Sequence, residues 1–191
     1  MTTGRLEAFT DAVIAIVITI LVLELKVPHE PDLEALRGVV PVFLTYVLSF
    51  VYLGIYWNNH HHMMVLTERV NGKILWANLH LLFWLSLVPV TTAWMGETDF
   101  AATPTAVYGV DLLLAAIAYF ILQTAIIAEE GPESRLRAAL GRDLKGKISP
   151  LLYFAAIPLA FVSPWIALAV YVFVALMWLV PDRRIESAVS E

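Results

Sequence analysis

The stretch RLEAFTDAVIAIVITILVLEL, residues 5–25, decides the fold expected for this chain. It joins a charged motif directly to an apolar helical run, in which residues 12–23 form 12 consecutive uncharged positions. Twelve helical residues measure about 18 Å, whereas a lipid-facing span needs roughly 20 apolar residues. Asp11 or Glu24, or both, must therefore lie near membrane depth, where ionisable groups face protein or a water-filled path. We expect other helices to shield this first helix, which makes it a candidate site or pore element.

The composition indicates an integral membrane protein. Hydrophobic residues make up 60% of the 191 residues and charged residues 15%, against about 45–50% and about 25% in a soluble domain. The absence of cysteine excludes disulfides and thiolate chemistry, and the net charge of −5 argues against a nucleic-acid partner. No P-loop, G-x-S-x-G, H-E-x-x-H or G-x-G-x-x-G motif occurs. We therefore expect neither an enzyme nor a bound cofactor.

The apolar runs predict an all-α chain with six transmembrane helices. The last run, residues 148–181, has 34 residues without a charge, and one helix of that length would measure about 51 Å against a hydrocarbon core of about 30 Å. Ser163-Pro164 lies within this run, and helices commonly end before a proline, so two helices are expected there. A single membrane domain, residues 1–182, should precede a cytoplasmic tail, residues 183–191. Its spans are expected at about 7–27, 39–58, 74–95, 102–128, 148–162 and 164–181.

The basic residues predict the orientation of the chain. With the N-terminus inside, ten of the twelve Lys and Arg residues fall in inner segments, and only Lys26 and Arg37 fall in outer ones. This bias predicts a multi-pass protein of the plasma membrane or cell inner membrane with both termini in the cytoplasm. The outer segments also hold six acidic residues: Glu24, Glu30, Asp32, Glu34, Glu97 and Asp99. Such a rim would concentrate cations, although acidic residues also simply fill solvated loops.

A helical wheel divides the first helix into two faces. At about 100° per residue, one narrow stripe collects large apolar side chains: Phe9, Ile16, Ile20 and Leu23. Thr19 lies on the flank of this stripe, and Asp11 lies about 140° away from it. In a symmetric oligomer such stripes could meet on the axis and narrow a water path, as in gates built from hydrophobic constrictions. The alternative is that the stripe packs against helices of its own subunit.

Several polar residues within the spans require partners. His80 and Asp111 could form a proton or ion relay, but a single interhelical hydrogen bond for each is the favoured interpretation. For Asp11 we expect a donor on the third helix, with His80 ahead of Asn78 or a tryptophan. His60-His61-His62 resembles a metal-binding cluster, yet adjacent helical side chains project about 100° apart. We therefore expect an interfacial helix end there and no metal site.

The motif Arg5-x-x-x-Phe9-Thr10-Asp11, followed by AIVITILVLEL, resembles the R-x-x-x-F-S-D signature of the transmembrane protein 175 family. The end of the second span, YWNNHHHMM, and the third span, LWANLHLLFWLSLVPVTTAWMGE, are similar to that family as well. Its members are potassium-permeable channels, lysosomal in animals, with bacterial relatives. Thr10 stands where the family usually has serine, which keeps the hydroxyl but adds β-branching.

The resemblance implies six helices, a tetramer for single-repeat bacterial members, and a central pore lined by first helices. It implies no carbonyl filter, and no TVGYG-like run occurs. The family's narrowest rings of aliphatic side chains map to Ile16, Ile20 and Leu23, and its neighbouring hydroxyl layer maps to Thr19. The resemblance, the helical wheel and the need of polar groups in the spans for partners together predict a network that holds the first helix against the other helices. Its members are Arg5, Phe9, Thr10, Asp11, Asn78 and His80.

These expectations describe a homotetrameric, potassium-preferring cation channel whose partners are potassium ions, the lipid bilayer and copies of itself. The channel should be leak-like, because no span carries the arginine ladder of a voltage sensor. One alternative is a proton-coupled secondary transporter that uses Asp11, His80 and Asp111. A less favoured alternative is a membrane metalloenzyme with ligands from His60 to His62.

Overall fold

A computed structural model describes residues 2–28, 31–141 and 143–179. The expected tail, residues 183–191, and Glu30 of the acidic rim lie outside the described residues. The described chain is helical throughout, and its elements are α1 (Thr3–Leu23), η1 (Ala35–Val39), α2 (Val40–Val65), α3 (Gly72–Glu97), α4 (Ala102–Glu130), η2 (Gly131–Glu133), α5 (Arg135–Leu140), α6 (Leu144–Leu159) and α7 (Pro164–Leu179).

Four helices in the described part of the chain are long and apolar enough to cross a membrane: α1, α2 with the preceding η1, α3, and α4. The helices α6 and α7 have 16 residues each, which corresponds to about 24 Å. α1 ends at Leu23, before the expected end of the first span near residue 27. The described part of the fold is therefore an all-helical bundle with four membrane-capable helices, the shorter apolar helix α7, and α6, whose first turn carries two lysines.

The run expected to break at Ser163-Pro164 forms two helices. α6 ends at Leu159 and α7 begins at Pro164. The amides of Val162 and Ser163 donate to the carbonyl of Leu159 at 3.0 and 2.9 Å, which closes the turn. Pro164 is well suited to the start of a helix because its fixed φ is helical and its missing N–H would have no intrahelical partner there. The two helices consequently pack against each other.

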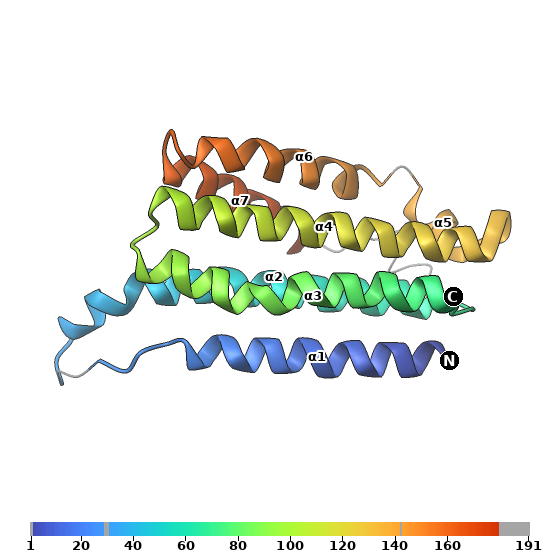
Figure 1. The fold of residues 1–191 in the computed structure, drawn as a ribbon, viewed down its shortest axis with the longest axis horizontal. Helices are drawn as coiled ribbons and strands as arrows, with labels where there is room; N and C mark the ends of the chain where they lie inside the picture. The colour runs from blue at the N-terminus through green and yellow to red at the C-terminus, as the bar shows by residue number, and fades with distance from the viewer. Residues whose placement is uncertain (1, 29–30, 142, 180–191) are drawn as a thin grey trace.

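The helices are stacked in layers (Figure 1). α1 lies along one edge and packs against α2 and α3, which form the next layer. α4 covers the other side of α3, and α6 and α7 lie beyond α4, with α7 also touching α2. One apolar core joins α1 to α4, and a second core joins α2, α4, α6 and α7. α1 is thus a peripheral helix of the single chain.

The close approach of α2 to α3 depends on Gly96. A Cβ atom built on Gly96 would lie 2.6 Å from the Thr45 hydroxyl oxygen and 2.8 Å from the Val42 Cα. Only glycine allows the two backbones to come this near, as small residues commonly do between membrane helices. This contact fixes the end of the α2–α3 pair next to the loop that follows α1.

Lys26 connects that loop to the C-terminal end of α3. Its Nζ lies 2.5 Å from the Glu97 carboxylate, and both side chains are largely exposed. The hydrogen bond to Glu97, and then the charge of that carboxylate, raise the pKa of Lys26. Exposed pairs of this kind contribute little to stability, so the ion pair serves mainly to position the loop.

Candidate pore helix and its supports

α1 has one buried and one exposed face. The buried face consists of Leu6, Thr10, Ile14, Val17 and Leu21. The stripe identified on the helical wheel lies on a separate face, about 110° around the helix, where Phe9 is 48%, Ile16 58%, Ile20 40% and Leu23 79% exposed. The stripe is therefore only partly covered by its own chain. It remains available to lipid, to water or to another copy of the chain.

The flank of the stripe is lined by small and hydroxyl-bearing residues. Ala8, Ala12, Ala15 and Thr19 are all exposed, and their spacing of four, three and four residues places them along one side of the helix. The Thr19 hydroxyl donates to the Ile16 carbonyl at 2.8 Å. Its oxygen retains lone pairs that can accept a hydrogen bond or contact a cation. Small side chains of this kind let a neighbouring membrane helix approach closely.

A buried polar triad attaches the other face of α1 to the bundle. The Asn78 amide nitrogen donates to the Thr10 hydroxyl oxygen at 2.8 Å, and the Asn78 amide oxygen lies 2.8 Å from His60 Nε2. Because a carbonyl oxygen only accepts, His60 must donate from Nε2. All three side chains are at most 1% exposed. The triad joins α1, α2 and α3 at one point.

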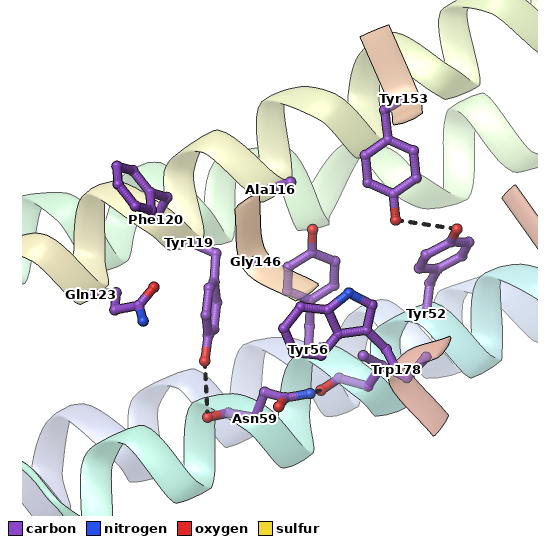
Figure 2. A pocket seen from close by; sticks show the side chains of 11 residues that line it. Tyr52, Tyr56, Asn59, Ala116, Tyr119, Phe120, Gln123, Gly146, Tyr153 and Trp178 are labelled. Carbon is purple, nitrogen blue, oxygen red and sulfur yellow. Dashed lines mark hydrogen bonds between the residues drawn. The ribbon is translucent and has the colours of Figure 1, made fainter. Parts of the chain in front are cut away.

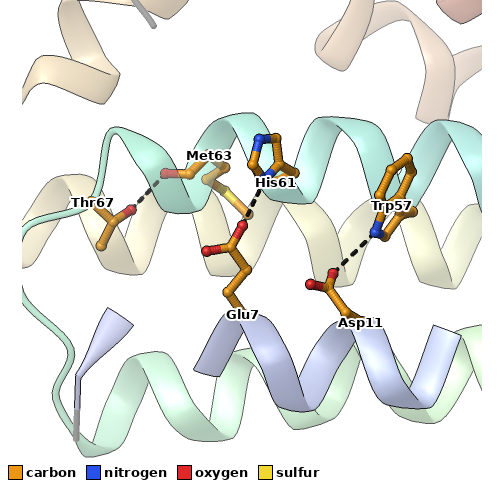
Figure 3. A network of polar contacts seen from close by, with 6 residues as sticks. All are labelled: Glu7, Asp11, Trp57, His61, Met63 and Thr67. Carbon is orange, nitrogen blue, oxygen red and sulfur yellow. Dashed lines mark hydrogen bonds and ion pairs between the residues drawn. The ribbon is translucent and has the colours of Figure 1, made fainter. Parts of the chain in front are cut away.

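A second seam runs between α1 and α2 (Figure 3). Trp57 Nε1 donates to the Asp11 carboxylate at 3.0 Å, and His61 Nδ1 lies 2.6 Å from the Glu7 carboxylate. Glu7 and Asp11 are one turn apart on α1, as are Trp57 and His61 on α2, so both pairs align along one edge of the helices. This seam holds the carboxylate of the sequence motif outside the exposed stripe.

The expected pairing of Asp11 with His80 is wrong. Asp11 lies on the flank of α1 that faces α2, and its donor is Trp57. His80 is exposed on α3, where its Nε2 accepts from Trp84 at 2.9 Å. Of the residues expected to hold α1, Thr10 and Asn78 are bonded directly, whereas Arg5 and Phe9 are exposed.

The histidine run is divided among different environments. His60 points into the bundle, where it completes the triad, and His61 lies on the seam with Glu7. Within the described ranges, no group of three metal-ligating side chains is placed to hold an ion. His60 was not predicted as a support, because the resemblance of YWNNHHHMM to the family did not distinguish one histidine from the next. A tryptophan was among the partners considered for Asp11, and the structure identifies it as Trp57 on α2.

The three residues of the transporter alternative have three separate partners. Asp11 is bonded to Trp57, His80 to Trp84, and Asp111 to Thr91 on α3. A proton relay requires groups within hydrogen-bond reach or joined by a water. The structure brings no two of these residues together by a direct hydrogen bond.

A small aromatic cavity lies on the far side of the bundle (Figure 2). It has a volume of about 50 Å³ and lies between α2, α4, α6 and α7, with no lining residue from α1. Three of its four tyrosine hydroxyls are bonded within the bundle: Tyr153 donates to the Tyr52 oxygen at 3.2 Å, Tyr52 to the Tyr171 carbonyl at 2.6 Å, and Tyr119 to the Asn59 carbonyl at 3.1 Å. These bonds stabilise the second core and leave the exposed face of α1 as the candidate site.

Comparison with known proteins identifies the family. The sequence model described as endosomal/lysosomal potassium channel TMEM175 matches residues 5–89. A potassium channel of Chryseobacterium sp. (strain P1-3) is 53% identical over 191 residues, which is the whole of both chains. A potassium channel of Streptomyces collinus is 32% identical over 92% of this chain and 90% of its own.

A solved structure has the same fold. The crystal structure of a lysosomal potassium-selective channel TMEM175 homolog from Chamaesiphon minutus superimposes with a TM-score of 0.82. The two chains are 30% identical, and the match covers 94% of this chain and 97% of the other. The chain also carries its own R-x-x-x-F-T-D motif on α1, the helix anchored by the Thr10–Asn78–His60 triad. Because these relatives match nearly the full length of both chains, the chain belongs to the TMEM175 family.

Proposed function

We propose that four copies of this chain form a potassium-preferring cation channel in which α1 lines a central pore. The observation that carries the proposal is the division of α1 into a bundle-facing side anchored by the Thr10–Asn78–His60 triad and an exposed aliphatic stripe. Relatives that match 88–100% of the chain are named potassium channels, which supports potassium as the permeant ion.

Each subunit contributes six spans in one membrane domain, with α6 and α7 as the last two. Figure 1 supports this arrangement because the N-terminus and the α4–α6 connection lie at one end of the bundle, and the α1–α2 and α6–α7 connections lie at the other. The first end carries Arg69, Lys73, Arg135, Arg137, Lys145 and Lys147. By the positive-inside rule this end faces the cytoplasm, so both termini are cytoplasmic.

The stripe supplies the constriction of the pore. Ile16, Ile20 and Leu23 from four subunits form stacked apolar rings, which close the path by excluding water and open it when they separate. Thr19 places a hydroxyl oxygen beside these rings, where it replaces part of the hydration shell of a passing cation. Because the spans lack an arginine ladder, conduction is leak-like and is not gated by voltage.

Single cysteines test whether the stripe faces water. The chain has no cysteine of its own, so Ile20→Cys introduces a unique thiol. A membrane-impermeant thiol reagent that carries a quaternary ammonium should abolish most of the potassium current of Ile20→Cys in planar bilayers. Oxidation should also link subunits into dimers on a denaturing gel, because the four thiols surround one axis.

Val22→Cys is the matched control for this experiment. Val22 is 46% exposed, close to the 40% of Ile20, but it lies about 160° from Ile20 around the helix. The reagent should leave its current unchanged. Equal block of both variants, or of neither, would contradict a pore lined by the stripe.

Thr19→Val should lower the preference for potassium over sodium severalfold. Valine keeps the shape of threonine and removes the oxygen that contacts a partly dehydrated ion, whereas Thr19→Ser retains the hydroxyl as a control. The measurement is the reversal potential in asymmetric potassium and sodium. Reversal potentials that are the same in all three channels would exclude a role of Thr19 in selectivity.

A further inference from the structure

A second polar site lies in the core of the subunit, away from the pore helix. Asp111 on α4 is 4% exposed, and its Oδ2 lies 3.0 Å from the Thr91 hydroxyl of α3. Its other oxygen, Oδ1, is buried and has no hydrogen-bond partner in the described structure. α1 packs chiefly against α2 and α3, so Asp111 is separate from the proposed ion path. The chemistry of Asp111 is independent of whether α1 lines a pore.

Among the described residues, no ion pair to this carboxyl group is found. The buried side chains of the described residues include no lysine or arginine, and the buried His60 is bonded to Asn78. Beside Asp111, α3 offers only the Thr91 hydroxyl, since Thr92 is bonded to Ser49. The titratable side chains that face the surrounding core from α2, α4, α6 and α7 are all tyrosines: Tyr52, Tyr56, Tyr108, Tyr153 and Tyr171. An ionised carboxylate with one donor would be strongly disfavoured in such a core.

The hydrogen bonds open to Asp111 and Thr91 distinguish the ionised from the protonated form of the Asp111 carboxyl group. Thr91 has one hydroxyl hydrogen, and its oxygen lies 3.0 Å from Asp111 Oδ2 and 3.2 Å from the Val88 carbonyl. With an ionised carboxylate, Thr91 gives its hydrogen to Oδ2, the Val88 carbonyl loses that donor, and a full negative charge is shared with Oδ1, which has no donor in either form. With a proton on Oδ2, Asp111 donates to Thr91, and Thr91 donates to the Val88 carbonyl. The protonated arrangement uses both hydrogens and leaves no net charge in the core.

We propose that Asp111 is a proton-binding site and that the bound proton keeps α3 and α4 packed together. Loss of the proton leaves a charge between these helices and loosens their contact. Because α1 packs on α3, the release of this proton also disturbs the support of the first helix. The site therefore makes the stability of the subunit depend on pH through a residue outside the α1 motif.

Infrared spectroscopy of the full chain in detergent tests the proposal directly. Exposed carboxyl groups are ionised at neutral pH, so a carboxylic acid C=O band there reports a buried protonated group. The band should be present in the wild type and in Asp99→Asn, which changes an exposed aspartate, and it should be absent in Asp111→Asn. A band of equal intensity in Asp111→Asn, or no band in the wild type, would overturn the proposal.

Thermal unfolding provides the second measurement. If the folded chain keeps a proton that the unfolded chain releases, the wild type should lose stability as the pH rises above about 4, the ordinary pKa of an aspartate. Asp111→Asn should show a smaller decline, and Asp99→Asn should follow the wild type. If potassium or sodium instead raised the melting temperature of the wild type and not of Asp111→Asn, the site would bind a metal cation and the proposal would be wrong.

Thr91 variants keep the test decisive if Asp111→Asn does not assemble. Thr91→Val removes the acceptor of the Asp111 proton and should shift the frequency of the acid band. Thr91→Ser keeps the hydroxyl and should leave the band in place. An unshifted band in Thr91→Val would show that the protonated group lies elsewhere.

Discussion

Replacing Ile20 with asparagine should raise the current through each channel severalfold and weaken its preference for potassium. Ile20 belongs to the exposed stripe of α1 and is 40% exposed on the single chain, so the substitution removes only part of a core contact within the subunit. Four amide groups at one level of a narrow apolar path would hold water and lower the barrier to a hydrated ion. Single-channel conductance and reversal potential in potassium and sodium gradients measure both effects.

Ile166→Asn is the matched control. Ile166 lies on α7, on the opposite side of the bundle, and is 44% exposed. The same substitution is therefore made at a site of similar exposure, away from α1. Its channels should conduct as the wild type does. Assembled Ile20→Asn channels with unchanged conductance and selectivity would show that the ion path does not pass along α1.

Asn78→Leu should destabilise the protein by roughly 2–6 kcal/mol, because it leaves two buried polar groups without a partner at about 1–3 kcal/mol each. These groups are the Thr10 hydroxyl and His60 Nε2, both of which are bonded to Asn78. Leucine has a similar volume, so the effect reports the lost hydrogen bonds and not a cavity. The yield of assembled protein and its melting temperature in detergent should both fall, and current should fall with them.

His80→Leu tests whether this loss is specific to the triad. His80 lies two residues further along α3 but is exposed and bonded only within its own helix, to Trp84. Its replacement should change the free energy of unfolding by less than about 1 kcal/mol. If His80→Leu were as damaging as Asn78→Leu, the anchoring of α1 would not depend on the triad.

Features that depend on local periodicity and backbone stereochemistry could be predicted from the sequence. The apolar run after Asp11 specified a helix, and its period of about 3.6 residues placed Phe9, Ile16, Ile20 and Leu23 on one stripe. Whether that stripe is exposed or packs on its own subunit was decided only by the structure. Pro164 marked the division of the last apolar run because its ring favours a helix start and disfavours a continuing helix. The family could also be recognised, since the R-x-x-x-F-T-D motif is contiguous in the chain.

Only the tertiary structure decided which polar groups meet. Asp11 lies on a flank of α1 that two neighbouring helices could have covered, and the position of α2 assigned it to Trp57 and not to His80. His60 and His61 differ by one residue, or about 100° around α2, and the rotation of that helix alone buries one and leaves the other at the seam. The physical reason is that helical periodicity fixes directions around a single axis, whereas the contacts of a side chain depend on how separate axes pack.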